Sequence, residues 1–191
     1  MFKILATFAP NMNDFTAELA KLHQLTGAEF SRQVERIALR KEFHPLETDP
    51  EIFTVGGENS DDYQNLLTAA RKAVEFGYRV YLLPNPIETR TPDFILAKKG
   101  VSRVYDLKTV FGKSSIENSL LDSIGQCDSI LINMNSDYNT RRLAHAIKRY
   151  FETNKKAIEV MLFKGRKRIT IKRAFAINQD FFANFKKSYE R

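Results

Sequence analysis

The chain is organised around Thr91-Pro92-Asp93-Phe94-Ile95-Leu96, which is soon followed by Arg103-Val104-Tyr105-Asp106-Leu107-Lys108-Thr109. Both stretches are rich in apolar, β-prone residues, and the polar segment between them, residues 97–102, contains Gly100. Two such runs joined by a turn are typical of a β-hairpin. The sequence therefore predicts a hairpin over residues 91–109.

Three charged side chains are unusual in this hairpin. Asp93 opens the first strand, whereas Asp106 and Lys108 interrupt the second. Residues two apart in a strand share a face, so Asp106 and Lys108 project to the same side. Aspartate is depleted in strands because it fits a half-buried pleated surface poorly. The trio therefore indicates a site. The alternative is an exposed edge hairpin in which Asp106 and Lys108 are solvated and Asp93 is a turn residue after proline.

Such a trio suits metal-assisted hydrolysis of a phosphodiester bond. Carboxylates bind hard divalent cations, here Mg²⁺ or Mn²⁺ with Zn²⁺ a weaker candidate. The metal polarises the phosphate and lowers the pKa of a bound water. A neighbouring lysine orients that water and offsets charge in the transition state.

The two aspartates meet only if the hairpin has a particular geometry. A turn centred on Gly100 places Asp93 opposite Leu107 and on its face, which separates Asp93 from Asp106. The register must shift by one residue, or a bulge must re-aim Asp93. We expect a bulge or bend at Pro92-Asp93.

Composition predicts an ordinary globular chain. With 191 residues, 43% of them hydrophobic, the chain is long enough to bury a core in one domain. The single cysteine, Cys127, excludes a disulfide framework. No apolar run is long enough to span a membrane, and the first ten residues do not resemble a signal peptide. We expect a cytoplasmic location.

Charge is distributed unevenly along the chain. Residues 1–50 contain six Lys and Arg against seven Asp and Glu, which leaves 24 against 16, or +8, for residues 51–191. A basic surface attracts phosphate backbones, although a basic hairpin can also serve solubility alone. The residues predicted to bind nucleic acid are Lys164, Arg166, Lys167, Arg168, Lys172 and Arg173.

Periodicity predicts helices over residues 12–42, then a linker with Pro45 and Pro50. We therefore divide the chain into a helical extension, residues 1–50, and a main domain, residues 51–191. Residues 58–134 predict the order helix, strand, strand, strand, helix, strand. A further helix from about residue 140, a hairpin around Gly165 and a short closing helix are expected after it.

This order of elements, with Pro92-Asp93 and Asp106-Leu107-Lys108 separated by twelve residues, resembles the PD-(D/E)xK nuclease superfamily. More narrowly, residues 55–172 resemble the C-terminal nuclease toxin domains of CdiA-type contact-dependent growth inhibition proteins and related mobile-element nucleases. The residues that carry this resemblance are Glu58, Thr91-Pro92-Asp93-Phe94, Asp106-Leu107-Lys108-Thr109, Ser115-Ile116-Glu117-Asn118 and Gln126.

The resemblance implies an α/β, restriction-endonuclease-like core (α-β-β-β-α-β, a central mixed sheet flanked by helices). The helical extension expected from periodicity precedes this core. It implies a divalent-metal-dependent endonuclease acting on DNA or RNA, tRNA included. Asp93, Asp106 and Glu58 would bind the metal, Lys108 would be the catalytic lysine and Gln126 would line the site. Glu58 has an alternative role as a charge at a helix start. A toxin would be delivered to another cell and paired with an immunity protein.

Two other classes of function remain open. One is a non-catalytic nucleic-acid-binding module, or a structural protein of a phage or mobile element, with a degenerate site. The other is a metal-independent ribonuclease using histidines as acid and base. The wide separation of His23, His44 and His145 argues against the ribonuclease.

Overall fold

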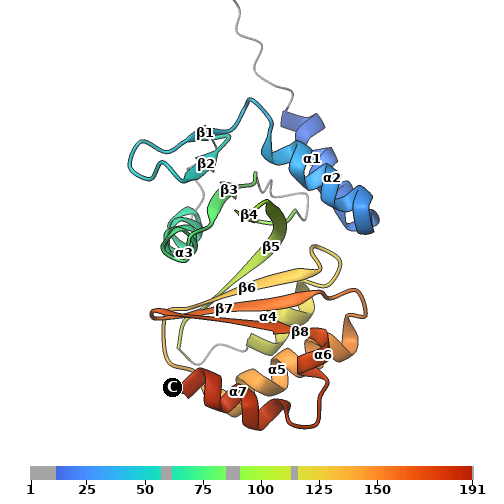
Figure 1. Ribbon diagram of the computed structural model, residues 1–191, viewed down its shortest axis with the longest axis vertical. Coiled ribbons are helices and arrows are strands. Elements are labelled where there is room, and N and C mark those ends of the chain that lie inside the picture. The colour runs from blue at the N-terminus through green and yellow to red at the C-terminus, as the bar shows by residue number, and fades with distance from the viewer. Residues whose placement is uncertain (1–11, 57–61, 85–90, 113–115, 191) are drawn as a thin grey trace, which may run out of the picture.

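The computed structural model describes residues 12–56, 62–84, 91–112 and 116–190. Within them, one mixed sheet has the strand order β1-β2-β3-β4-β5-β6-β7-β8, with helices packed on both faces (Figure 1). The strands are β1 (His44–Pro45), β2 (Ile52–Thr54), β3 (Arg79–Leu82), β4 (Phe94–Lys98), β5 (Val101–Val110), β6 (Ser129–Met134), β7 (Glu159–Lys164) and β8 (Lys167–Lys172). The helices are α1 (Met12–Lys21), η1 (Leu22–Gln24), α2 (Gly27–Ala38), α3 (Tyr63–Glu75), α4 (Ile116–Asp122), α5 (Thr140–Thr153), α6 (Arg173–Ala176) and α7 (Phe181–Glu190).

The predicted α/β fold with a central mixed sheet is confirmed, and so is the order α3-β3-β4-β5-α4-β6. Strand β4 is antiparallel to β3 and to β5, whereas β5, β6 and β7 run parallel. Every residue of β6 is buried, as its uninterrupted apolar run predicts for a central parallel strand. The predicted hairpin around Gly165 is formed by β7 and β8.

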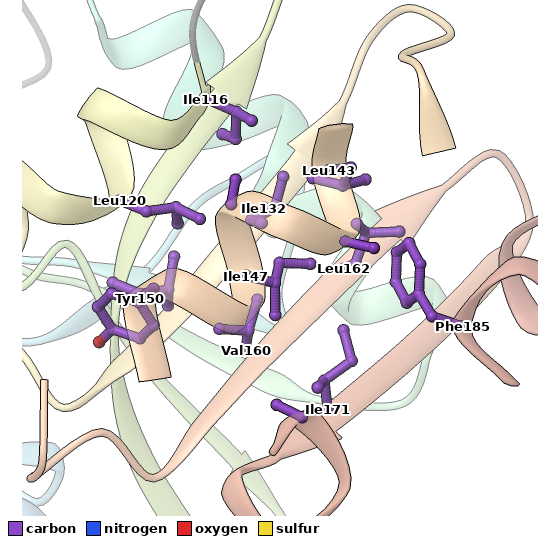
Figure 2. Packing of buried hydrophobic residues seen from close by; sticks show 14 of the residues in the cluster. Ile116, Leu120, Ile132, Leu143, Ile147, Tyr150, Val160, Leu162, Ile171 and Phe185 are labelled. Atoms are coloured by element: carbon purple, nitrogen blue, oxygen red, sulfur yellow. The ribbon is translucent and has the colours of Figure 1, made fainter. Parts of the chain in front are cut away.

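The largest hydrophobic cluster fixes β6, β7 and β8 beneath α4, α5 and α7 (Figure 2). Its members include Ile116, Leu120, Ile132, Leu143, Ile147, Tyr150, Val160, Leu162, Ile171 and Phe185. Helix α5 begins at the Asn139 cap, whose side chain accepts a hydrogen bond from the N–H of Arg142 at 2.9 Å. One face of α5, which includes Leu143, Ile147 and Tyr150, is apolar and buried. The burial of this face holds α5 on the sheet.

Helices α1 and α2 form the expected N-terminal pair and pack on the sheet. Phe15 and Ile37 share a hydrophobic cluster with Tyr81, Ile95 and Val104. Strand β1 pairs with β2, so residues on both sides of the predicted division at residue 50 belong to one sheet. The division itself stays a prediction. In the described part of the chain, no helix has the length and apolar character needed to cross a membrane.

Candidate active site

The β4–β5 hairpin has a tighter turn than one centred on Gly100. Lys99 and Gly100 form a two-residue turn with φ values of 51° and 75°. Positive φ at both central residues matches the twist of paired strands, and glycine adopts it without strain. The resulting register pairs Phe94 with Tyr105, one residue away from the register that separates the aspartates.

Asp93 lies where the regular pairing ends, and the chain bends there, as predicted. Its N–H donates to the carbonyl oxygen of Tyr105 at 2.9 Å. Its carboxylate Oδ2 accepts a hydrogen bond from the N–H of Leu107 at 2.6 Å. Register and bend together bring the Asp93 side chain against β5, beside Asp106.

The carboxyl groups of Asp93 and Asp106 form a buried pair. The residues are 8% and 3% exposed, and the two carboxyl groups are hydrogen-bonded to each other. Burial, followed by the negative charge of Asp106, raises the pKa of Asp93 to about 8. Burial also raises the pKa of Asp106, although Lys108 opposes the shift. At neutral pH the pair therefore retains a proton, which Asp93 donates to Asp106.

Lys108 completes the trio on the same face as Asp106. Its Nζ lies 2.8 Å from Asp106 Oδ2, and its side chain is 20% exposed. The ammonium therefore forms an ion pair with Asp106, and its positive charge opposes the rise in the pKa of that carboxyl group. The predicted convergence of Asp93, Asp106 and Lys108 is therefore present in the structure.

The donor chemistry of this pair suits a hard divalent cation. Two adjacent buried carboxyl groups that retain a proton form a site where added positive charge is stabilised. Among the described residues, no group of three or more His, Cys, Asp or Glu could hold a metal ion. The predicted third ligand, Glu58, lies outside the described residues. Two carboxylates are nonetheless sufficient protein ligands for Mg²⁺, which usually keeps several waters.

Gln126 lies in the turn between α4 and β6, where its N–H donates to the carbonyl oxygen of Ser123 at 3.0 Å. The next residue, Cys127, is buried, with its Sγ 3.3 Å from the carbonyl oxygen of Val104. Burial raises the pKa of this thiol, and the charge of nearby Asp106 adds to the shift. The sequence analysis did not predict that Cys127 lies near the site. Its position next to Gln126 in the sequence could have indicated this. The role of Gln126 stays a prediction.

The predicted nucleic-acid-binding residues occupy different places in the fold. Lys164, Arg166 and Lys167 surround the β7–β8 turn. Arg168 donates to the Tyr78 hydroxyl at 2.7 Å, and Lys172 is exposed at the other end of β8.

Arg173 is anchored within the fold. Its guanidinium donates to the carbonyl oxygen of Phe151 at 2.6 Å and to that of Asn154, and it lies over the Phe151 ring. These carbonyls close the C-terminal end of α5, where a cation is stabilising. The structure thus gives Arg173 a structural contact in place of the free surface position that the basic run suggested.

Replacing Arg173 by Ala is expected to lower the free energy of unfolding by about 1.5–3 kcal/mol, because two hydrogen bonds from a charged donor are lost. Lys172→Ala removes the same charge from an exposed position and should change stability by less than about 0.5 kcal/mol. Urea denaturation of both variants measures the difference. Reduced nucleic-acid affinity of Arg173→Ala at unchanged stability would contradict the structural role.

The described residues thus form an α/β fold with an Asp-Asp-Lys trio on its central hairpin. No protein family model matches the chain, and no curated protein sequence matches it. The structure is similar to a chain of the "CdiA-CT/CdiI toxin and immunity complex from Burkholderia pseudomallei", with a TM-score of 0.41 and 16% sequence identity. The match covers 58% of this chain and 84% of that chain. Because this likeness is partial, the function proposed below rests on the side chains of the chain itself.

Proposed function

We propose that the chain is a divalent-metal-dependent nuclease that hydrolyses phosphodiester bonds in DNA or RNA. One observation carries this proposal: the buried carboxyl groups of Asp93 and Asp106 meet beside the partly exposed Lys108. A purely structural hairpin has no reason to bury two carboxyl groups in contact, since their burial and mutual repulsion cost stability.

Each of the three side chains has a distinct role in the proposal. Asp93 and Asp106 would hold Mg²⁺ or Mn²⁺, with Glu58 as a proposed third ligand. When bound, the ion supplies Lewis-acid polarisation of the phosphate and a more acidic water. Lys108 is held beside Asp106 and is exposed enough to reach a phosphate, where its ammonium offsets developing negative charge.

The backbone of the hairpin keeps these groups in place. The Leu107 N–H donates to the Asp93 carboxyl group and holds it against β5, and the chain bends at Asp93. The parallel pairing of Asp106 with Ile130 and of Lys108 with Ile132 anchors β5 against the buried strand β6. A site built on paired strands holds its geometry more tightly than one built on loops.

The proposal extends to biological context through the sequence resemblance. As a CdiA-type toxin domain, the chain would act after delivery into another cell, and an immunity protein would bind it to block the activity.

Purified protein incubated with plasmid DNA, total RNA and tRNA, with Mg²⁺ or with EDTA, tests the proposal. We expect cleavage of at least one substrate with Mg²⁺ or Mn²⁺ and loss of cleavage with EDTA, because the bound ion would supply the polarisation of the phosphate and the more acidic water. Cleavage that persists in EDTA would indicate a metal-independent ribonuclease. Binding without cleavage would indicate a nucleic-acid-binding module.

A further inference from the structure

A cavity lies at the carboxyl ends of β6 and β7. Lys164, Arg166 and Lys167, around the β7–β8 turn, line one side of a cavity of about 520 Å³. Residues 134–137, which follow β6, line the other side. In open α/β sheets, ligands bind in crevices outside the carboxyl ends of parallel strands.

The charge of this cavity favours an anion. Within the described residues, neither Arg166 nor Lys167 forms an ion pair. Lys164 donates to the carbonyl oxygen of Tyr189 at 3.3 Å, and its Nζ lies 3.8 Å from the centre of that ring. The acidic residue in the lining is Asp137, 3.5 Å from Lys164 with its side chain 93% exposed, so solvent screens it. Two cations therefore remain for a bound phosphate.

An exposed aromatic residue lies in the segment that borders the cavity. Phe111, which follows β5, is 55% exposed. The residues on either side of it are tied to the cavity wall: the Asn135 N–H donates to the Val110 carbonyl oxygen at 3.2 Å, and the Gly112 N–H donates to Ser136 Oγ at 2.6 Å. An exposed ring next to a cationic cavity is the combination on which unpaired bases stack.

The strand register places this cavity at a defined distance from the Asp-Asp-Lys trio. Val110, Met134 and Lys164 are neighbours on three adjacent strands, and Lys108 precedes Val110 by two residues on the same face. With about 4.8 Å between strands and about 3.3 Å per residue, the Cα atoms of Lys108 and Lys164 are roughly 12 Å apart. A few nucleotides of a single strand can span this separation.

We propose that the cavity binds a backbone phosphate of an unpaired nucleic-acid strand, with an adjacent base stacked on Phe111, a few nucleotides from the bond cleaved beside Lys108. The position of the cleaved bond rests on the proposed nuclease function, whereas the binding does not. The ligand class is therefore single-stranded DNA or RNA, or an unpaired loop of a folded RNA.

The test is fluorescence anisotropy with a single-stranded oligonucleotide of about 12 nucleotides in EDTA, so that nothing is cleaved. The full chain is compared with the Arg166→Ala/Lys167→Ala double variant across salt concentrations. Removing two phosphate contacts should reduce the slope of log K against log salt by about 1.4 in magnitude. The Lys155→Ala/Lys156→Ala variant changes the net charge equally at exposed positions before β7 and should keep the wild-type slope.

Phe111 provides the second measurement. Phe111→Ala is expected to weaken binding of the single strand by about 5- to 150-fold, while Phe111→Tyr keeps a ring for stacking and should bind like wild type. Binding of a duplex should be nearly unaffected by either change, because its bases are already stacked.

Equal slopes for the two double variants would overturn the proposal, since binding would then be diffuse. Equal affinities of Phe111→Ala and wild type would overturn the stacking contact. Failure of the nuclease proposal looks different: wild type would bind the strand through the cavity in EDTA and leave it intact with Mg²⁺.

Discussion

Lys108→Met is expected to reduce the rate of phosphodiester cleavage by about 10²–10³-fold, because the transition state loses the ammonium that offsets its charge. Methionine retains the unbranched chain, so packing beside Asp106 is kept. Single-turnover kinetics at saturating enzyme isolates this effect from binding. Lys187→Met, at an exposed position on α7, is the matched control and should cleave at the wild-type rate.

Asp106→Asn is expected to remove cleavage as well, since an amide binds a divalent cation far more weakly than a carboxylate. The side chain keeps its size and the fold should persist, with an unchanged far-UV circular dichroism spectrum. Asp180→Asn, at an exposed position before α7, controls for the loss of one negative charge. A large fall in Tm with activity retained would make Asp106 a structural residue.

The same substitution tests the toxin proposal. Expression of the wild-type chain inside bacterial cells should arrest growth, whereas the Asp106→Asn chain should be tolerated. Growth arrest by both chains would show that toxicity does not depend on the Asp-Asp-Lys trio.

The metal-free protein is expected to lose stability as the pH rises from about 4 to about 8. Asp93 keeps its proton up to about pH 8 in the folded chain, whereas an unfolded aspartate loses it near pH 3.9. Between these values the folded state binds more protons, so the free energy of unfolding falls with rising pH by up to about 1.4 kcal/mol per pH unit. Below and above this window, the contribution of Asp93 is constant.

Thermal unfolding in EDTA at several pH values measures this effect as the difference in Tm between wild type and Asp93→Asn. The asparagine variant does not titrate at this position, so its Tm should fall less as the pH rises. Mg²⁺ should raise the wild-type Tm more at pH 8 than at pH 5, because metal and proton compete for the same carboxyl pair. Parallel Tm curves for the two chains, with no effect of Mg²⁺, would remove the metal from the proposal.

Local sequence determined much of the hairpin and the order of the elements around it. The two-residue alternation of a strand puts Asp106 and Lys108 on one face whatever the rest of the fold does. The bend at Asp93 follows from a proline and an aspartate at the strand start. Helix α5 and the buried strand β6 were likewise predictable, because an apolar stripe and an apolar run are local patterns.

Tertiary structure decided which distant groups meet. The alternation of residues along the strands does not distinguish two pairings of β4 with β5 that differ by one residue. The Lys99-Gly100 turn selected the pairing that brings Asp93 to Asp106. The basic run looks uniform in the sequence, yet folding tied Arg173 to the end of α5 and left Arg166 beside a cavity.

The cavity near Phe111 could not be predicted from the sequence either, because it too is formed by segments that are distant in the chain. It exists because parallel pairing aligns Val110, Met134 and Lys164, which lie in three segments separated by helices. Alternation and turn chemistry specify each strand on its own. The alignment of parallel strands depends on how the helices that connect them pack on the sheet. Only the folded core supplies that constraint.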